Sequence, residues 1–302
     1  MHNIAIAIHG GAQNKPRSEF SEEKLPAFKS GLNEALTRGW ELLSRGYSAL
    51  DAVEESVRSL EDNPLFNAAR GSDFTEQGDL EFDASIMWGK TLEAGTVAAV
   101  RLIKNPVSLA RKVMENSNHI LLAAKGAEDF AGKNNIETRP FDYFVSPEKM
   151  PQWRNSQNEK KLNRPNDTVG AVALDIDGNL AAACSTGGLQ NQLGGRIGVS
   201  PSIGAGTYAD IEVCAAVCTG DGELIIRGVY AHELYALIKY KNLSLHDAIE
   251  EVFLINSLSL KAQMDMIAID PKGNIELKYN TLPMHRAYKK GNNPAYIAIL
   301  EE

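Results

Sequence analysis

The segment Asn166-Asp167-Thr168-Val169-Gly170 carries the clearest chemistry in this sequence. A threonine hydroxyl is a weak nucleophile at its ordinary pKa. An α-amine on the same residue titrates at about 7.7 to 8.0, so it can accept the hydroxyl proton near neutral pH. Cleavage of the Asp167–Thr168 bond would therefore give one residue both the attacking oxygen and the base.

The residues before Thr168 favour such a cut. Positions 146–167 are polar and contain three prolines and the basic pair Lys160-Lys161, a composition typical of an exposed, mobile linker. The apolar run 171–174 follows almost at once and predicts a buried strand. A β-branched residue at the start of a strand is common for purely structural reasons. The linker that precedes Thr168 is therefore the feature that points to a chain-terminal nucleophile.

Glycine-rich segments follow this threonine at 185–188, 194–198, 203–208 and 218–223. Glycine lets backbone N–H groups come close to a ligand, as an oxyanion hole requires. The sequence lacks both the Lys-Ser/Thr ending of a Walker A loop and the spaced glycines of a dinucleotide fingerprint, which argues against nucleotide binding. Arg196 lies among these glycines, where its guanidinium could hold a substrate carboxylate or could lie in a surface turn.

The composition narrows the class of partner. A net charge of −8 and a pI near 5.4 argue against nucleic acid, because binding phosphates needs a basic surface. The three cysteines lie in apolar, strand-like segments, typical of buried thiols in a reducing compartment, and the histidines show no metal-ligand spacing. The N-terminus lacks a signal-peptide pattern, and no apolar run approaches the ~20 residues of a membrane span. We expect a cytoplasmic protein that acts on a small molecule.

Hydrophobic periodicity predicts an α+β fold in a single domain over residues 1–302. Apolar spacings of three and four predict amphipathic helices within 32–43 and 50–60, the second capped by Ser48 with Asp51. Further helices are predicted over 107–130, with Ser108 as the cap, and over 229–240 and 245–254. Strands are predicted at 3–8, 80–87, 96–103, 168–174, 180–185, 212–218, 223–226, 266–269 and 275–279. This order favours sheets covered by helical layers.

Taken in order, these segments resemble the plant-type asparaginase and isoaspartyl peptidase family of N-terminal nucleophile hydrolases, over nearly the whole chain. The resemblance implies a four-layer αββα sandwich, made as a precursor that cuts itself into residues 1–167 and 168–302, which stay together. It also implies a homodimer of such cleaved units. The motifs that carry it, besides the nucleophile segment, include His9-Gly10-Gly11-Ala12, Asn63-Pro64-Leu65-Phe66-Asn67-Ala68, Ser185-Thr186-Gly187-Gly188 and Gly195-Arg196-Ile197-Gly198.

The resemblance also implies roles for single residues. Thr168 Oγ would attack the Asp167 carbonyl during self-cleavage, and later attack the substrate with its own amine as base. No cofactor is implied for catalysis, but the loop 60–70 resembles one that binds a structural Na⁺. The other implied site residues are Thr186 beside the nucleophile, Thr219 and Gly220 as the oxyanion hole, Arg196 for the substrate α-carboxylate, Gly222 near the α-amine and Asn67 near the pocket. The implied sodium ligands are the backbone carbonyls of Leu60, Glu61, Asn63, Phe66, Ala68 and Arg70.

The chain departs from the family pattern at four places. Val199 stands where the family has an aspartate that pairs with the substrate's α-ammonium, so recognition of L-asparagine should weaken by roughly tenfold to a hundredfold. Met264-Asp265 replaces two glycines, and Gln13 and Ala69 replace one each. We expect the fold and the self-cleavage to tolerate these changes better than the substrate specificity does.

Three functions remain open from the sequence. The first is an amidohydrolase that cleaves β-aspartyl amide bonds of L-asparagine, isoaspartyl dipeptides or both, and releases L-aspartate. The second is the same threonine chemistry on a substrate without a free α-amine, which Val199 favours. The third is a catalytically silent relative that acts as a binding protein. The complete set of Thr168, Thr186, Thr219 and Gly220 argues for an enzyme.

Overall fold

Two β-sheets lie face to face in the computed structural model, which describes residues 4–12, 23–159 and 167–300. The larger sheet has the strand order β12-β11-β1-β5-β6-β2-β3-β4, and the smaller one β10-β9-β8-β7. The strands of the larger sheet, in that order, are Tyr296–Ala298, Met284–Lys290, Ala5–Ala12, Val169–Leu174, Leu180–Thr186, Phe82–Trp88, Glu93–Val100 and Leu121–Ala123. Those of the smaller sheet are Ile275–Tyr279, Met264–Ile269, Cys214–Gly220 and Thr207–Asp210.

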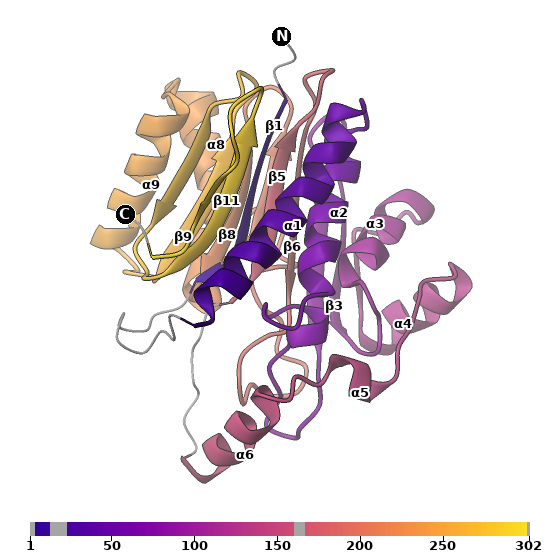
Figure 1. Cartoon of the computed structure of the whole chain (residues 1–302). Coiled ribbons are helices and arrows are strands. Elements are labelled where there is room, and N and C mark those ends of the chain that lie inside the picture. Colours follow the sequence, from indigo (N-terminus) through magenta and orange to yellow (C-terminus); the bar gives the residue numbers. More distant parts are fainter. Residues whose placement is uncertain (1–3, 13–22, 160–166, 301–302) are drawn as a thin grey trace.

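Helices cover the outer face of each sheet (Figure 1). Helices α1 (Leu25–Ser44), α2 (Ala49–Glu61) and α3 (Pro106–Asn116) pack on the larger sheet, and α8 (Tyr230–Lys241) and α9 (Leu245–Leu258) pack on the smaller one. The remaining helices are α4 (Ala124–Lys133), α5 (Phe141–Phe144), α6 (Lys149–Glu159) and α7 (Gly222–Gly228). This is the expected four-layer αββα sandwich, and the α+β prediction is confirmed.

The alternation of side chains along β1 explains the layers. Successive residues of a strand point to opposite faces of a sheet. Accordingly Ile4, Ile6 and Ile8 belong to the core beneath α1 and α2, whereas Ala5 and Ala7 belong to the core between the two sheets. A third core joins the smaller sheet to α8 and α9. Three buried interfaces thus hold four layers together.

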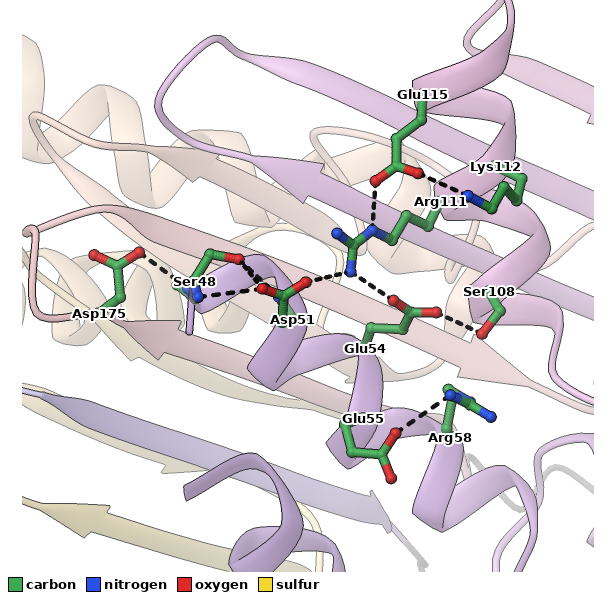
Figure 2. A network of polar contacts seen from close by, with 11 residues as sticks. Ser48, Asp51, Glu54, Glu55, Arg58, Ser108, Arg111, Lys112, Glu115 and Asp175 are labelled. Atoms are coloured by element: carbon green, nitrogen blue, oxygen red, sulfur yellow. Dashed lines mark hydrogen bonds and ion pairs between the residues drawn. The ribbon is translucent and has the colours of Figure 1, made fainter. Parts of the chain in front are cut away.

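A polar network ties α2 to α3 and to the turn between β5 and β6 (Figure 2). Ser48 and Asp51 form the expected capping box at the start of α2. From α3, Arg111 Nη1 donates to Asp51 Oδ1 and to Glu54 Oε2, both at 2.7 Å. Asp175, at the end of β5, accepts a hydrogen bond from the Ala49 backbone N–H at 3.0 Å. The helical layer is therefore anchored to the β5–β6 hairpin by charged and capping contacts.

Two predicted elements were wrong. The helix predicted over 107–130 is divided into α3 and α4 by β4, which pairs with β3 in parallel, and Asn105 rather than Ser108 occupies the N-cap position of α3. The segment predicted as a strand at 223–226 forms α7, because Asp221 starts a helix there instead of a hairpin turn. Strands β7, β11 and β12 were missed, although β7 pairs with the next strand, β8, and β12 pairs with the preceding strand, β11.

The segment predicted as a loose linker, 146–167, contains helix α6, so the linker prediction is wrong for residues 149–159. Trp153 anchors this helix: its Nε1 donates to the Thr75 backbone oxygen at 2.8 Å, and its ring centroid lies 5.6 Å from that of Phe74. Lys149 also pairs with the buried Asp73 at 2.9 Å. Residues 160–166, including Lys160-Lys161, lie outside the described part of the chain.

The three thiols are free and buried, as predicted. None of the helices in the described part of the chain combines the length and the apolar character that crossing a membrane would need.

His285 is a buried base in the core between β11 and α1. Its ring stacks on Phe28 with centroids 4.6 Å apart and an interplanar angle of 11°. Burial lowers the pKa of His285 to about 4, against the opposing effect of the Gly10 backbone. An ordinary histidine in an unfolded chain titrates near 6.5. The unfolded state therefore binds a proton that the native state excludes between about pH 4 and 6.5, so this group makes the protein less stable as the pH falls through that range.

We predict that His285→Phe reduces the acid sensitivity of the fold. Phenylalanine keeps the ring stacking but cannot take up a proton, so the loss of unfolding free energy between pH 7 and pH 4.5 should shrink by about 2 to 3 kcal/mol. Urea denaturation at both pH values measures this. His119→Phe, at an exposed position, is the control. Equal losses in wild type and His285→Phe would contradict the prediction.

Candidate active site

Thr168 lies at the start of β5, a central strand with a partner on each side. Within the larger sheet β5 pairs with β1 and with β6, in antiparallel register along its whole length. Thr168 and Gly170 lie on the same face of the chain. A side chain on Gly170 would meet His9 Nε2 at 2.5 Å and Val217 of β8 at 3.1 Å. Thr168 therefore points into the space between the two sheets, at one end of their shared core.

The side chain of Thr168 is almost fully buried, with 6% of its surface exposed. The hydroxyl of Ser200 donates to Thr168 Oγ1 across 3.4 Å. The carbonyl oxygen of Ser200 in turn accepts a hydrogen bond from Ser85 Oγ of β2 at 2.5 Å. Sequence analysis missed Ser200, since it lies 32 residues from the threonine and belongs to no motif considered. The contact places a hydroxyl donor beside the Thr168 oxygen.

The cavity in front of Thr168 brings together seven of the predicted site residues. Its free volume, about 10 Å³, is roughly that of one water molecule. Asp167 forms part of its wall, packed so tightly against Gly11 that a side chain on that glycine would meet Asp167 Cα at 2.8 Å. With the Asp167–Thr168 bond intact the cavity is thus nearly full. It is lined by Asp167, Thr168, Thr186, Gly188, Leu189, Arg196, Gly198, Val199, Gly220 and Gly222.

Two predicted residues lie just behind this wall. Thr219 is fully buried in β8, next to Gly220. Asn67 supports the loop after Thr186: its Nδ2 donates to the Gly188 carbonyl at 2.8 Å, and its own carbonyl accepts from the Gly187 N–H at 2.9 Å. Asn67 therefore shapes the cavity through the backbone of two glycines rather than by lining it.

Strand β9 accommodates the Met264-Asp265 pair without opening the site. Opposite Gly220, the side chain of Met264 joins the core beneath α8 and α9. Asp265 lies opposite Thr219 and accepts hydrogen bonds from Thr281 Oγ1 at 2.7 and 2.9 Å. Burial raises the pKa of Asp265 to about 7, and the hydrogen bonds from Thr281 oppose this rise. The substitution thus places a buried acid beside the strand that carries Gly220, on the face of β9 that points between the sheets.

Arg196 reaches the cavity from a loop that two acidic residues hold in place. Asp83 Oδ2 accepts from the Gly198 N–H at 2.9 Å, and Glu81 Oε2 accepts from the Gly195 N–H at 2.7 Å. Burial raises the pKa of Asp83 to about 6, opposed by the hydrogen bonds from the Gly198 and Ala99 backbone. Sequence analysis gave Asp83 no role, although an acidic residue within an apolar strand was the available signal.

The guanidinium of Arg196 is already oriented by side chains. Its Nε donates to Glu223 Oε1 at 2.9 Å, and its Nη1 lies 3.4 Å from Gln192 Oε1. Glu223 belongs to α7, the helix that sequence analysis took for a strand, so this contact was not foreseen. One edge of the planar fork is thereby fixed while the residue lines the cavity.

The loop 60–70 turns tightly before β2. The Ala68 N–H donates to the Phe66 carbonyl at 3.0 Å, and the Gly71 N–H donates to the Ala68 carbonyl at 3.3 Å. Ala69 has φ +44°, a conformation that favours glycine, which agrees with the glycine that the resemblance implied at this position. Gln13 lies outside the described residues. Across those residues, no group of three or more His, Cys, Asp or Glu side chains could hold a metal ion.

His9 borders the nucleophile from β1. It pairs across the sheet with Gly170, and it is fully buried. Burial lowers the pKa of His9 to about 3, although the Thr168 backbone acts in the opposite direction. His9 is therefore neutral near pH 7, and it brings no charge to the site.

Comparison with known proteins shows which family this chain is similar to. Residues 2–299 match the family model described as Asparaginase. The chain is 43% identical to the isoaspartyl peptidase of Salmonella typhimurium and 42% identical to that of Escherichia coli, covering 100% of this chain in both cases and 100% and 98% of those proteins. It is also 40% identical to the plant-type L-asparaginase of Pyrococcus horikoshii, over 95% of this chain and 96% of that protein.

We predict that Gly220→Ala strongly destabilises the protein. Gly220 has φ +138°, and a side chain there would meet the Gln263 carbonyl oxygen at 2.1 Å. Backbone strain and this clash should lower the free energy of unfolding by about 2 to 4 kcal/mol, as measured by urea denaturation.

Gly126→Ala is the matched control for this variant. Gly126 lies in α4 with nothing within 4 Å of a new side chain, so it should gain about 0.5 to 1 kcal/mol of stability. Similar effects of the two substitutions would refute the strain argument at Gly220.

Proposed function

This chain belongs to the asparaginase family, and we propose that it hydrolyses β-aspartyl amide bonds with Thr168 as nucleophile. Its family makes it a hydrolase, and its relatives are named isoaspartyl peptidase and L-asparaginase. The observation that carries the role of Thr168 is its place: a buried hydroxyl, beside the hydroxyl of Ser200, in a cavity shared with Arg196 and Gly220.

We propose that the first reaction of this site is on the chain itself. Thr168 Oγ attacks the Asp167 carbonyl carbon, the peptide C–N bond breaks, and the resulting ester is hydrolysed by water to leave Asp167 as a chain end and Thr168 with a free amine. Two observations support this. Asp167 is held against Gly11 beside the hydroxyl, and the intact chain leaves only about 10 Å³ free in the cavity. A substrate needs the room that Asp167 occupies.

In the second reaction, the freed amine of Thr168 takes the proton of its own hydroxyl, which attacks the side-chain amide of a β-aspartyl compound. A carboxylate on the substrate pairs with Arg196, whose fork is already oriented by Glu223. The developing oxyanion lies near Gly220, where the backbone of β8 reaches the cavity, with Thr219 behind it. Loss of ammonia or an amino compound leaves a β-aspartyl ester, and water then releases L-aspartate.

We also propose a structural Na⁺ in the loop 60–70, bound by the backbone carbonyls of the six residues named for it above. The tight turn after Phe66 and the left-handed φ of Ala69 support a loop curved around a small ion. Hard cations prefer oxygen ligands, and a carbonyl oxygen has a second lone pair beyond its hydrogen bond.

The sodium proposal predicts a dependence of stability on the cation. Replacing Na⁺ by choline at constant ionic strength should lower Tm by several degrees, because an ion that binds only the native state stabilises it. Differential scanning calorimetry at matched ionic strength measures this. Identical Tm values in the two salts would rule out the site.

A homodimer of processed units and a cytoplasmic location complete the proposal. The dimer rests on the family alone, and light scattering of the purified protein tests it. Three buried free thiols support a reducing compartment.

We predict that Thr168→Ala abolishes both self-cleavage and hydrolysis, because alanine has no hydroxyl to attack either carbonyl. Denaturing electrophoresis should show one full-length band for this variant and two bands for the wild type, of the sizes of residues 1–167 and 168–302. Thr168→Ser, which keeps the hydroxyl, is the control and should still cut, more slowly. Turnover of an amide by Thr168→Ala would remove Thr168 from its role.

A further inference from the structure

The charges around the cavity are unbalanced in a way that restricts the substrate. Of the described residues that line it, Arg196 is the one cation and Asp167 the one carboxylate. Asp167 supplies the acyl group in the proposed self-cleavage, so a substrate's acyl group must later take its place. Once that happens, the lining offers a cation and no anion.

Three other acids lie near Arg196 but do not line the cavity. Asp83 is 4% exposed, and its two oxygens accept the backbone N–H groups of Ala99 and Gly198. Glu223 is largely exposed and pairs with the Nε edge of Arg196. Asp221 precedes α7, and its backbone N–H bonds to Gln263. None of these three residues lines the cavity.

Val199 forms the wall beside Arg196. Gly222 lies between the two: a side chain on it would meet Arg196 Nη2 at 3.1 Å and Val199 Cβ at 3.7 Å. A group bound to the same substrate carbon as the carboxylate held by Arg196 therefore reaches Val199. Gly206 also packs against Val199: a side chain on this glycine would meet Val199 Cγ2 at 3.1 Å. Val199 is 4% exposed and belongs to the apolar core with Ile225 and Tyr230.

An ammonium group in that position would be poorly accommodated. It would lose water against hydrocarbon, next to the positive charge of Arg196, without a carboxylate in return. A hydrogen atom carries no such penalty, and an uncharged amide nitrogen carries a smaller one. Leu189, another apolar residue of the lining, adds to the same preference.

We propose that the preferred substrates are ω-amides that keep the carboxylate for Arg196 but carry no charged nitrogen on the adjacent carbon. Such compounds are monoamides of four-carbon dicarboxylic acids and asparagine derivatives acylated on the α-nitrogen. This inference rests on the proposed function, since it uses the same nucleophile. Thr168 Oγ bonds to the amide carbon, its proton passes through the α-amine to the departing ammonia, the C–N bond breaks, and water hydrolyses the ester to the dicarboxylate.

The inference can be tested on the wild-type enzyme by the ratio of kcat/KM values for two kinds of substrate. We expect kcat/KM at pH 7 to be about tenfold to a hundredfold higher for succinamate or N-acetyl-L-asparagine than for L-asparagine. The ratio of L-asparagine to succinamate should rise with pH as the substrate amine, which titrates at about 8 or above, loses its proton. Titration of the enzyme's own amine changes kcat/KM for both substrates alike, so it does not change their ratio. Succinamate has no nitrogen on the adjacent carbon, whereas N-acetyl-L-asparagine has an acylated one. Comparing the two shows which kind of substrate the site prefers.

Two variants then assign the effect to Val199. Val199→Asp should reverse the preference at pH 7 by about tenfold or more, because it supplies the missing carboxylate. Val199→Asn has nearly the same shape without the charge and should not favour L-asparagine. Two bands on denaturing electrophoresis establish that each variant is folded and processed. If the aspartate variant fails this check, the wild-type ratio and its pH dependence decide alone.

The outcomes separate the inference from the function beneath it. A wild-type enzyme that prefers L-asparagine at pH 7, with a ratio independent of pH, overturns the inference while leaving the hydrolase intact. Processed protein that cleaves neither these three amides nor an isoaspartyl dipeptide overturns the proposed function instead.

Discussion

The pairing of β5 between β1 and β6 is the constraint on which the rest of this structure depends. Because β5 is buried and paired on both edges, the strand that follows Thr168 is held firmly within the larger sheet. The groups around Thr168 also come from the ends of strands: Thr186 closes β6, and Gly220 closes β8 in the facing sheet. Strand pairing brings Thr186 beside Thr168, and the packing of the two sheets brings Gly220 to the same end of the inter-sheet core.

Buried carboxylates control the flexible part of the site. The Arg196 loop has glycines on both sides, so its own backbone specifies little. Asp83 and Glu81 supply acceptors for its N–H groups from the neighbouring sheet. Ionised carboxylates accept hydrogen bonds strongly, and burial makes that conditional for Asp83, whose pKa rises to about 6. The loop that carries the cation is therefore held by acids that do not line the cavity.

Local sequence signals predicted part of this fold, but the neighbouring strand pairs β7–β8 and β11–β12 were not recognised. The capping box at Ser48 and the strands β5 and β6 have short-range signals, and all three were predicted. Residues 223–226 were wrongly predicted as a strand from their apolar run. That run does not reveal that the Asp221 N–H bonds to Gln263, 42 residues later. The Ser200–Thr168 contact had no signal of either kind. The nucleophile itself was found because motif and resemblance both mark it.

The order of strands in the larger sheet has a consequence for the life of the molecule. Residues before the scissile bond supply β1, β2, β3 and β4, and those after it supply the other four, yet β1 sits between β11 and β5. Once cut, neither fragment could rebuild this interleaved sheet by itself. Refolding would become a second-order encounter between two polypeptides, slower on dilution, so the mature enzyme would be preserved by a slow rate of opening rather than by easy recovery.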